Sequence, residues 1–387
     1  MKILYCIAGT YRSGGMERVL CNKVNYLVGR GFDVIVVTTD QRERSPFFAF
    51  DKRVRFFDLD INYEENNGKS VFNKIIKYPT KLCLHYIRLR KLLNREHPDI
   101  SISMFCNDVS FLPLIHDGSV KLLEIHFSRF KRLQYGRKGL WRLLDRMRSV
   151  LDKQWARMYE KFVVLTYEDA GLWGKMPNLE VVYNASPYKT DCKSDLSAKK
   201  VLAVGRYTFQ KGFDLLLQSW HIVTMKCPDW KLEIVGEGTK ESIAQLKRLI
   251  SRYQLADSVV LTAPTSDITE KYLSSSFVAM SSRYEGLPMI LIESQTFGLP
   301  VVCFDCHCGP SDIIRNGVNG FLVKMGEIES FAEKMTKLIR DPRLRLEMGR
   351  EARLNSSRFD EDIIMKKWIN IFKEVLYVKE NHRSLGC

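Results

Sequence analysis

Two glutamates, Glu285 and Glu293, stand eight residues apart in the segment SRYEGLPMILIE. Glu285 follows an apolar run of strand length, and Glu293 lies beyond Pro288, a residue favoured at the first position of a helix. The backbone N–H groups of Gly286 and Leu287 would then lie at a helix N-terminus, where anions bind. This pattern suits a ligand with hydroxyl groups at both ends and phosphate between them. Such a spacing also occurs by chance on the surface of an amphipathic helix.

Cations and glycines follow two other apolar runs. Arg206 ends the run KVLAVGR, and Lys211 precedes the next helical stretch, so both could neutralise a pyrophosphate. Gly14 and Gly15 follow the first apolar run of the chain and would let a ligand approach the backbone closely. Taken alone, the two cations would more often be solvated surface charges, and a tight strand-to-helix turn needs glycine in any case.

The elements that must position these residues alternate between strand-length apolar runs and helical periodicity, the pattern of parallel α/β sheets. The first series predicts strands at 2–8, 33–39, 54–60, 99–105, 121–127 and 162–166, with helices from 15, at 71–95 and at 139–160. The second series predicts strands at 200–206, 231–238, 259–264, 277–282, 299–305 and 320–324, with helices from 213, at 240–253 and from 289. We therefore expect two doubly wound α/β domains, with the ligand at the strand ends in a cleft between them.

The chain of 387 residues is longer than the roughly 300 that one core usually supports. A polar stretch at 186–199 is the predicted linker between an N-terminal domain, 1–185, and a C-terminal domain, 200–358. The tail at 360–380 has apolar residues at helical spacing and is expected to pack back on the N-terminal domain.

The order of these motifs resembles the retaining glycosyltransferases of family 4, whose GT-B fold has two Rossmann-like domains facing a cleft. The motifs are GGxER, VGR with a following KG, EGLP, E-x7-E and GLPVV, and they extend over nearly the whole chain. By resemblance, the cations would bind the donor diphosphate, Glu293 the nucleotide ribose and Glu285 the hydroxyl groups of the transferred sugar. The residues implied to bind the donor are Gly15, Arg206, Lys211, Gly286, Leu287, Pro288 and Glu293.

The resemblance also implies that His126, at the end of the strand 121–127, contacts the donor sugar near its anomeric centre. His126 and Glu285 are therefore the predicted catalytic residues. The chemistry depends on stabilising charge on the leaving phosphate, and retention is attributed to front-face attack assisted by that phosphate. No protein nucleophile is assigned. No cofactor and no divalent metal are expected, because the motif itself supplies cations and the nucleotide sugar is a co-substrate.

Some features of the sequence also occur in other classes of protein. The segment CFDCH matches the pattern of covalent haem attachment, which needs an exported chain, and its clustered ligands could scarcely surround a zinc ion. A nicotinamide dehydrogenase is disfavoured because GEG at 236–238 has no third glycine at the required spacing. A nucleotide-sugar epimerase of GT-B fold and a basic nucleic-acid-binding protein remain as alternatives.

The chain carries a net charge of +15, and the segment from Lys121 to Lys161 contributes twelve basic and four acidic residues. A helix starting near 139 would place apolar and basic residues on separate stripes. The apolar stripe is Leu140, Leu144, Met147, Leu151 and Met158, and the basic stripe is Arg142, Arg146, Lys153 and Arg157. Either the helix buries its apolar stripe beneath solvated charges, or its basic face, with Arg129, Lys131 and Arg132 beside it, contacts anionic lipid.

No apolar run approaches the roughly 18 residues that span a bilayer, and no cleavable signal is recognised, so we expect a cytoplasmic protein. The predicted function is transfer of a hexose or N-acetylhexosamine from a nucleotide-diphosphate sugar, with UDP as the expected nucleotide. The expected acceptor is a growing, lipid-linked glycan of a surface polysaccharide. The expected partners are this donor, this acceptor and the anionic inner face of the cell membrane, without nucleic acid.

Overall fold

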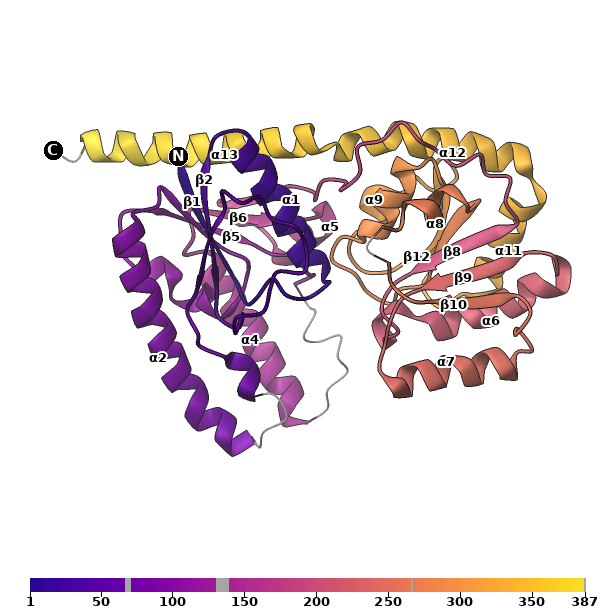
Figure 1. Cartoon of the computed structure of the whole chain (residues 1–387), viewed down its shortest axis with the longest axis horizontal. Coiled ribbons are helices and arrows are strands. Elements are labelled where there is room, and N and C mark those ends of the chain that lie inside the picture. Colours follow the sequence, from indigo (N-terminus) through magenta and orange to yellow (C-terminus); the bar gives the residue numbers. More distant parts are fainter. Residues whose placement is uncertain (67–70, 130–138, 266, 386–387) are drawn as a thin grey trace. The chain divides into compact units, whose positions relative to one another are not determined.

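The computed structural model describes residues 1–66, 71–129, 139–265 and 267–385. The chain divides into two compact units, one formed by Met1–Tyr183 with Ile364–Cys387 and the other by Asn184–Ile363 (Figure 1). The residues predicted as a linker, 186–199, belong to the second unit, and the tail from Ile364 onward belongs to the first.

The first unit is built on a parallel sheet with seven strands among the described residues, in the order β3-β2-β1-β4-β5-β6-β7. Most of these strands are buried along their length, as expected for sheets covered on both faces, which explains their continuous apolar sequences. The strands are β1 (Lys2–Ile7), β2 (Asp33–Thr38), β3 (Arg55–Asp58), β4 (Ile100–Ser103), β5 (Val120–Glu124), β6 (Lys161–Val164) and β7 (Leu179–Val181).

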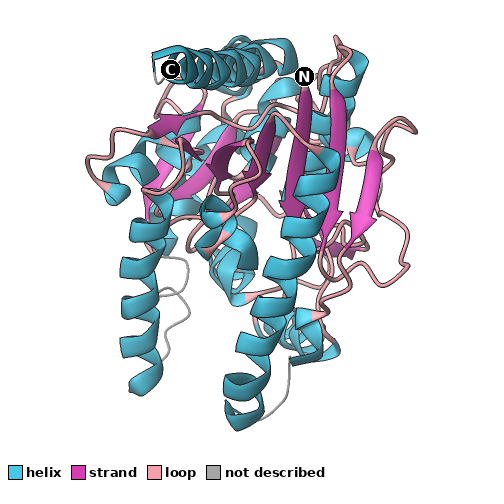
Figure 2. Cartoon of the chain, turned by 90° about the vertical axis from the view of Figure 1, so that its left-hand side faces the viewer, coloured by secondary structure: helices cyan, strands magenta, loops and turns pink. Residues whose placement is uncertain are grey.

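Helices flank this sheet (Figure 2). In α1, apolar residues recur at helical spacing and are buried, whereas the polar face is solvated. The C-terminal helix α13 buries Trp368 and Phe372. The helical elements of the unit are α1 (Gly15–Gly29), η1 (Tyr63–Asn66), α2 (Val71–Glu96), η2 (Asn107–Ser110), η3 (Leu112–Leu114), α4 (Leu140–Ala156), α5 (Tyr167–Trp173) and most of α13 (Glu361–Leu385).

The second unit repeats the plan with a parallel sheet in the order β10-β9-β8-β11-β12-β13. Its strands are β8 (Lys200–Val204), β9 (Lys231–Val235), β10 (Val259–Thr262), β11 (Phe277–Met280), β12 (Val301–Asp305) and β13 (Gly320–Lys324). Its helical elements are η4 (Phe209–Lys211), α6 (Phe213–Lys226), α7 (Lys240–Arg252), α8 (Thr269–Leu273), α9 (Met289–Thr296), α10 (Pro310–Ile313), α11 (Ile328–Arg340), α12 (Pro342–Ser356) and η5 (Ser357–Phe359).

In both sheets the strand order reverses beside the first strand of the unit. β1 lies between β2 and β4, and β8 lies between β9 and β11. Loops at the carboxyl ends of such strands form the ligand site of doubly wound sheets, because helices on opposite faces diverge there. The predicted fold class, two doubly wound α/β domains, is therefore confirmed.

The helix predicted at 139–160 is present as α4, and of the two alternatives for it, the one that buries its apolar stripe is not what the structure shows. Leu144, Met147 and Leu151 are exposed, and the buried stripe contains Asp145 and Asp152 instead. Small and polar side chains on this stripe let α4 pack closely against η2, and the charge of Asp152 is compensated by Arg129. Lys131 and Arg132, predicted beside the basic face, lie outside the described residues.

The described helices include none that is both long and apolar enough to cross a bilayer.

Candidate functional site

The loops after β8 and β11 carry most of the predicted donor residues, and they lie beside each other where the strand order reverses. Gly212, in the first of these loops, has a φ of +62°, and an added Cβ would lie 2.2 Å from the carbonyl oxygen of Ser281. Glycine is therefore required for the two loops to pack this closely. Ser281 also donates a hydrogen bond to the carbonyl oxygen of Lys211, at 2.9 Å.

The predicted residues Lys211 and Glu285 form an ion pair, with 2.7 Å between Nζ and Oε1. Both are largely buried. The loops that follow β8 and β12, the two strands beside β11, hold the backbone next to Glu285. Gln210 donates to the carbonyl oxygen of Tyr284 at 3.0 Å, and the backbone N–H of Glu285 donates to the carbonyl oxygen of His307 at 3.2 Å. The side chain of Glu285 is thus positioned at the strand ends by the loops after β8 and β12.

The segment Gly286-Leu287-Pro288 is shaped from the side of β12. Gly309 has a φ of +105°, and an added Cβ would lie 2.4 Å from Cδ of Pro288. Leu287 and Pro288 are buried, whereas Gly286 is half-buried, so the turn is most accessible at the backbone of Gly286. Helix α9 begins directly after this turn, with Pro288 at the N-cap position. The turn therefore stands where a helix N-terminus can bind an anion.

The other two predicted donor residues differ in their surroundings. Arg206 is exposed in the loop directly after β8. This exposure leaves its guanidinium group accessible to a phosphate from solvent. Glu293 is buried in α9, where the hydroxyl group of Tyr272 donates to its Oε2 at 2.7 Å. The ring of Tyr272 stacks on Phe297, with 5.0 Å between ring centres. Tyr272 was missed by the sequence analysis, because nothing local marks it as a partner of Glu293.

Arg283 is a second residue of this site that was not predicted. Its guanidinium group makes two hydrogen bonds to the carboxylate of Asp214 at the start of α6, at 2.9 and 2.6 Å. The same group lies 4.1 Å from the ring centre of Phe209. Bidentate pairing and stacking together fix the loop after β11 to the opening of α6. Arg283 precedes Glu285 by two residues, so this attachment positions the carboxylate.

In the first unit, His126 lies two residues beyond β5, and its side chain is 5% exposed. Its Nε2 lies 3.0 Å from Oε1 of Glu124. The same carboxylate pairs with Lys23 of α1, and the ammonium group of Lys23 lies 3.7 Å from the ring centre of Trp368. These contacts define a buried cluster, Lys23-Glu124-His126, beneath α13.

Electrostatics favour the ionised form of Glu124 despite its burial. Burial alone would raise the pKa of Glu124, but the neighbouring Lys23 and His126 lower it to about 2. Burial lowers the pKa of Lys23, and the attraction of Glu124 opposes that effect. The carboxylate therefore fixes the ring of His126. Lys23 lies in the apolar stripe of α1, three residues after Leu20. A lysine at such a position is unusual, and it could have indicated from the sequence that Lys23 has a buried acidic partner.

The glycine-rich turn after β1 is accessible at one of its two glycines. An added Cβ at Gly15, the first residue of α1, would meet no atom within 4 Å. An added Cβ at Gly14 would lie 2.1 Å from the carboxylate of Glu17. The backbone at Gly15 therefore has the open space that the predicted donor contact requires.

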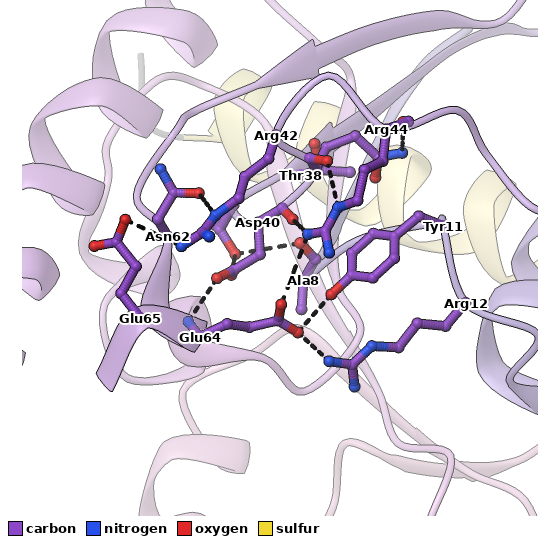
Figure 3. Close-up of polar contacts among 12 residues, drawn as sticks. Ala8, Tyr11, Arg12, Thr38, Asp40, Arg42, Arg44, Asn62, Glu64 and Glu65 are labelled. Atoms are coloured by element: carbon purple, nitrogen blue, oxygen red, sulfur yellow. Dashed lines mark hydrogen bonds and ion pairs between the residues drawn. The ribbon is translucent and has the colours of Figure 1, made fainter. Parts of the chain in front are cut away.

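A polar network at the ends of β1 to β3 also escaped the sequence analysis (Figure 3). Glu64 accepts a hydrogen bond from the hydroxyl group of Tyr11 at 2.5 Å and pairs with Arg12 and, at 3.6 Å, with Arg44. The backbone N–H of Glu64 donates to Asp40 at 2.8 Å. The loops that follow three neighbouring strands are thereby fixed to one another at the ligand edge of this sheet.

The segment CFDCH shows no arrangement suited to a metal or a haem. Burial raises the pKa of the thiols of Cys303 and Cys306, which favours their protonated forms. Within the ranges that the structure covers, no three His, Cys, Asp or Glu side chains are grouped so as to hold a metal ion.

Comparisons with known proteins identify the relatives of this chain. Residues 189–355 match the family model described as glycosyl transferases group 1. The amylovoran biosynthesis glycosyltransferase AmsD of Erwinia amylovora is 31% identical over 391 residues, covering 96% of this chain and 99% of the relative. A Campylobacter jejuni protein, named as an α-1,4-N-acetyl-D-galactosaminyltransferase acting on a glycan linked to diphospho-undecaprenol, is 24% identical, covering 97% and 99%.

Among solved structures, a variant of S. aureus TarM in complex with UDP, fondaparinux and α-GlcNAc-glycerol has a TM-score of 0.75 at 16% identity, covering 96% of this chain and 99% of that one. The predicted GT-B fold is therefore confirmed. Relatives of this chain are glycosyltransferases of bacterial polysaccharide biosynthesis. The extent of the likeness to AmsD, together with the match of the second unit, shows that the chain is a member of the group 1 glycosyl transferases.

Proposed function

We propose that this glycosyltransferase moves a hexose or N-acetylhexosamine from a UDP-sugar to a growing lipid-linked glycan, with retention of the anomeric configuration, as in family 4. The observation that carries the proposal is the ion pair of Lys211 and Glu285. It brings a phosphate-binding cation and a hydroxyl-binding carboxylate together where a doubly wound sheet binds its ligand. A sugar bonded to a diphosphate needs both groups.

Each charged residue then has a role in the transfer. Arg206 and Lys211 neutralise the diphosphate, whose negative charge grows as the sugar leaves. Glu285 accepts hydrogen bonds from sugar hydroxyl groups, and Glu293, held by Tyr272, accepts them from the ribose. The turn Gly286-Leu287-Pro288 provides backbone N–H groups at the start of α9.

His126 contributes from the first unit. Its ring contacts Glu124, and Glu124 pairs with Lys23. The imidazole is therefore already oriented before the substrate binds, so no conformational entropy is lost in ordering it during the reaction. In this proposal the ring contacts the sugar near its anomeric carbon. No residue is assigned as a nucleophile, and the leaving phosphate accepts the proton of the attacking hydroxyl group.

The choice of substrates rests on the relatives. UDP is present in the complex of the structurally similar TarM variant, and the Campylobacter jejuni relative is named for an undecaprenol-linked acceptor. A panel of UDP- and GDP-sugars, assayed by nucleotide release with lipid-linked acceptors, tests the proposal. NMR of the product reports whether the anomeric configuration is retained. Hydrolysis or epimerisation of every donor without transfer would overturn it.

UDP is expected to raise the melting temperature of the protein. A ligand at 100 times its dissociation constant adds about 2.7 kcal/mol of stability, which for a unit of this size corresponds to roughly 5 to 11 °C. Thermal denaturation monitored with increasing UDP measures the shift, and a variant with Arg206→Gln and Lys211→Gln should lose most of it. The absence of any shift with millimolar nucleoside diphosphates would contradict the proposed donor site.

Activity and UDP binding are expected to survive removal of divalent metals. Arg206 and Lys211 supply positive charge at the diphosphate. In metal-dependent transfer, Mg²⁺ or Mn²⁺ neutralises this charge. Turnover is compared before and after dialysis against EDTA, with the Arg206→Gln variant as a control that is weakened in both conditions. A loss of activity that returns with added Mg²⁺ or Mn²⁺ would show that the cations are insufficient.

A further inference from the structure

Phe209, in the loop between β8 and α6, exposes an aromatic ring beside the predicted donor residues. Among the large apolar side chains that the structure describes, none is more exposed than this one, at 70%. Single exposed apolar residues are common on proteins and need no explanation by themselves. Phe209 differs from them because it lies at the ligand edge of the sheet and because its ring is held in place.

The backbone beneath the ring is anchored to the loops of both neighbouring strands. On one side, the N–H of Tyr207 donates to the carbonyl oxygen of Glu237, after β9, at 2.6 Å. On the other side, the N–H of Arg283, after β11, donates to the carbonyl oxygen of Gln210 at 2.7 Å. Phe209 lies between these two anchors, as the first residue of η4. The exposed ring therefore stands on a fixed backbone.

Arg283 also holds the ring itself. Its guanidinium carbon lies 4.1 Å from the ring centre, and its Nη1 donates to the carbonyl oxygen of Phe209 at 2.8 Å. Asp214 in turn holds the guanidinium group through two hydrogen bonds. A fixed cation thus covers one face of the ring, and the exposed surface lies on the opposite face. A ligand that stacks there meets a preorganised surface, so little conformational entropy is lost on binding.

We propose that Phe209 is a stacking surface for one sugar ring of the acceptor glycan. A pyranose ring has C–H groups on its faces and hydroxyl groups around its rim. It can therefore bury apolar surface against an aromatic ring while its hydroxyl groups stay hydrated. This inference rests on the proposed function, and it deepens it by naming a residue that favours acceptors whose glycan is long enough to reach Phe209.

The contacts of Phe209 favour a sugar over the uracil base of the donor. Arg283 ties Phe209 to the segment that carries Glu285, the carboxylate proposed for the transferred sugar. Glu293, the carboxylate proposed for the ribose, is held from α8 by Tyr272. A uracil ring also needs hydrogen-bond partners at its edge, and the carbonyl oxygen of Phe209 already accepts from Arg283.

The exposure of the ring favours the acceptor over the transferred sugar. A sugar at the reaction centre is shielded from water, and the side chains proposed to act there, Lys211 and Glu285, are largely buried. A ring that is 70% exposed instead lies where a glycan would extend from the site into solvent. Stacking at this place adds affinity for a longer glycan without taking part in the chemical step.

Saturation-transfer NMR with two trisaccharides, maltotriose and triacetylchitotriose, tests the proposal in the full-length protein with UDP present. Saturation of the protein's aromatic protons should reach the C–H protons of at least one trisaccharide. Phe209→Ala should weaken the binding of that trisaccharide about fivefold to tenfold, because the stacked ring no longer buries apolar surface. Phe209→Tyr should keep the binding, whereas Phe209→Leu, which is apolar but not planar, should lose most of it.

The matched control is Tyr377→Ala, which removes a similarly exposed aromatic ring from α13 and should leave trisaccharide binding as in the wild type. In the transfer assay, Phe209→Ala should raise KM for the glycan acceptor and change kcat less. All variants should keep the UDP-induced thermal shift, which shows that they are folded. Because trisaccharide binding needs no transfer, its outcome is separate from that of the proposed function.

Two results would overturn the proposal outright. They are unchanged trisaccharide binding by Phe209→Ala and the absence of saturation transfer to both trisaccharides in the wild type. A UDP affinity lowered more than about threefold in Phe209→Ala would identify the ring as a surface for the base and would also overturn it.

Discussion

Replacing Glu285 by glutamine should lower the turnover number by about two to three orders of magnitude while changing the affinity for UDP less than threefold. The amide is neutral, so it loses the stronger hydrogen bonds that a carboxylate accepts as the sugar develops positive charge. UDP itself has no transferred sugar, and its binding should therefore be nearly unaffected. Steady-state kinetics and calorimetry of UDP measure the two quantities.

Glu293→Gln should give the opposite result, with UDP affinity lowered about tenfold or more and a smaller change in turnover at saturating donor. Tyr272→Phe is the matched control, because it removes the hydroxyl group that holds Glu293 and leaves the carboxylate in place. Its effect on UDP affinity should be weaker than that of Glu293→Gln. Equal losses of UDP affinity in the Glu285 and Glu293 variants would contradict the separate roles.

Lys23→Met should lower the free energy of unfolding by about 3 to 5 kcal/mol, because it leaves the carboxylate of Glu124 buried without its ammonium partner. For a unit of this size the loss corresponds to roughly 6 to 20 °C in melting temperature. The double variant with Glu124→Gln should recover most of it, since no uncompensated charge then remains buried. A double variant no more stable than Lys23→Met would show that the ion pair is not the cause.

The same cluster makes a prediction about pH. The pKa of Glu124 is lowered to about 2 in the folded protein, against about 4.3 in an unfolded chain. Its contribution is therefore present in full above the unfolded value and is lost as the pH falls toward 2. The difference in melting temperature between the wild type and Lys23→Met should accordingly shrink between about pH 5 and pH 2. A difference that grows over this range would contradict the assignment.

Much of the fold could be predicted because buried parallel strands have continuous apolar sequences. The runs expected at 33–39 and 231–238 correspond to β2 and β9, with the ends shifted by one to three residues. Strand β7 was missed because its three residues are too short for a pattern. Lys211 and Glu285 are 74 positions apart in the sequence. Their contact could still be expected, because both follow strands of one parallel sheet and the carboxyl ends of such strands lie at the same edge.

The parts that could not be predicted depend on contacts between elements. An amphipathic pattern shows that α4 has two different stripes, but it does not show which stripe faces the sheet, and the polar one does. Lys23 is buried because Glu124 and Trp368 meet it from β5 and α13, which lie far along the chain. Tyr272 reaches Glu293 from α8 for the same reason.

The first unit is formed by two separate stretches of the chain, 1–183 and the residues from 364 onward, and this fixes the order in which the two units can be completed during synthesis. Residues 184–363 form the second unit and leave the ribosome before α13, which supplies Trp368 beside Lys23 and Glu374, paired with Lys161 at 2.9 Å. Domains usually fold as they emerge, starting from the N-terminus. Here the N-terminal unit must wait for the contacts that α13 makes with Lys23 and Lys161 until residues 364–385 have been translated. A released chain that ends at residue 363 should therefore have a protease-resistant second unit and a protease-sensitive first one.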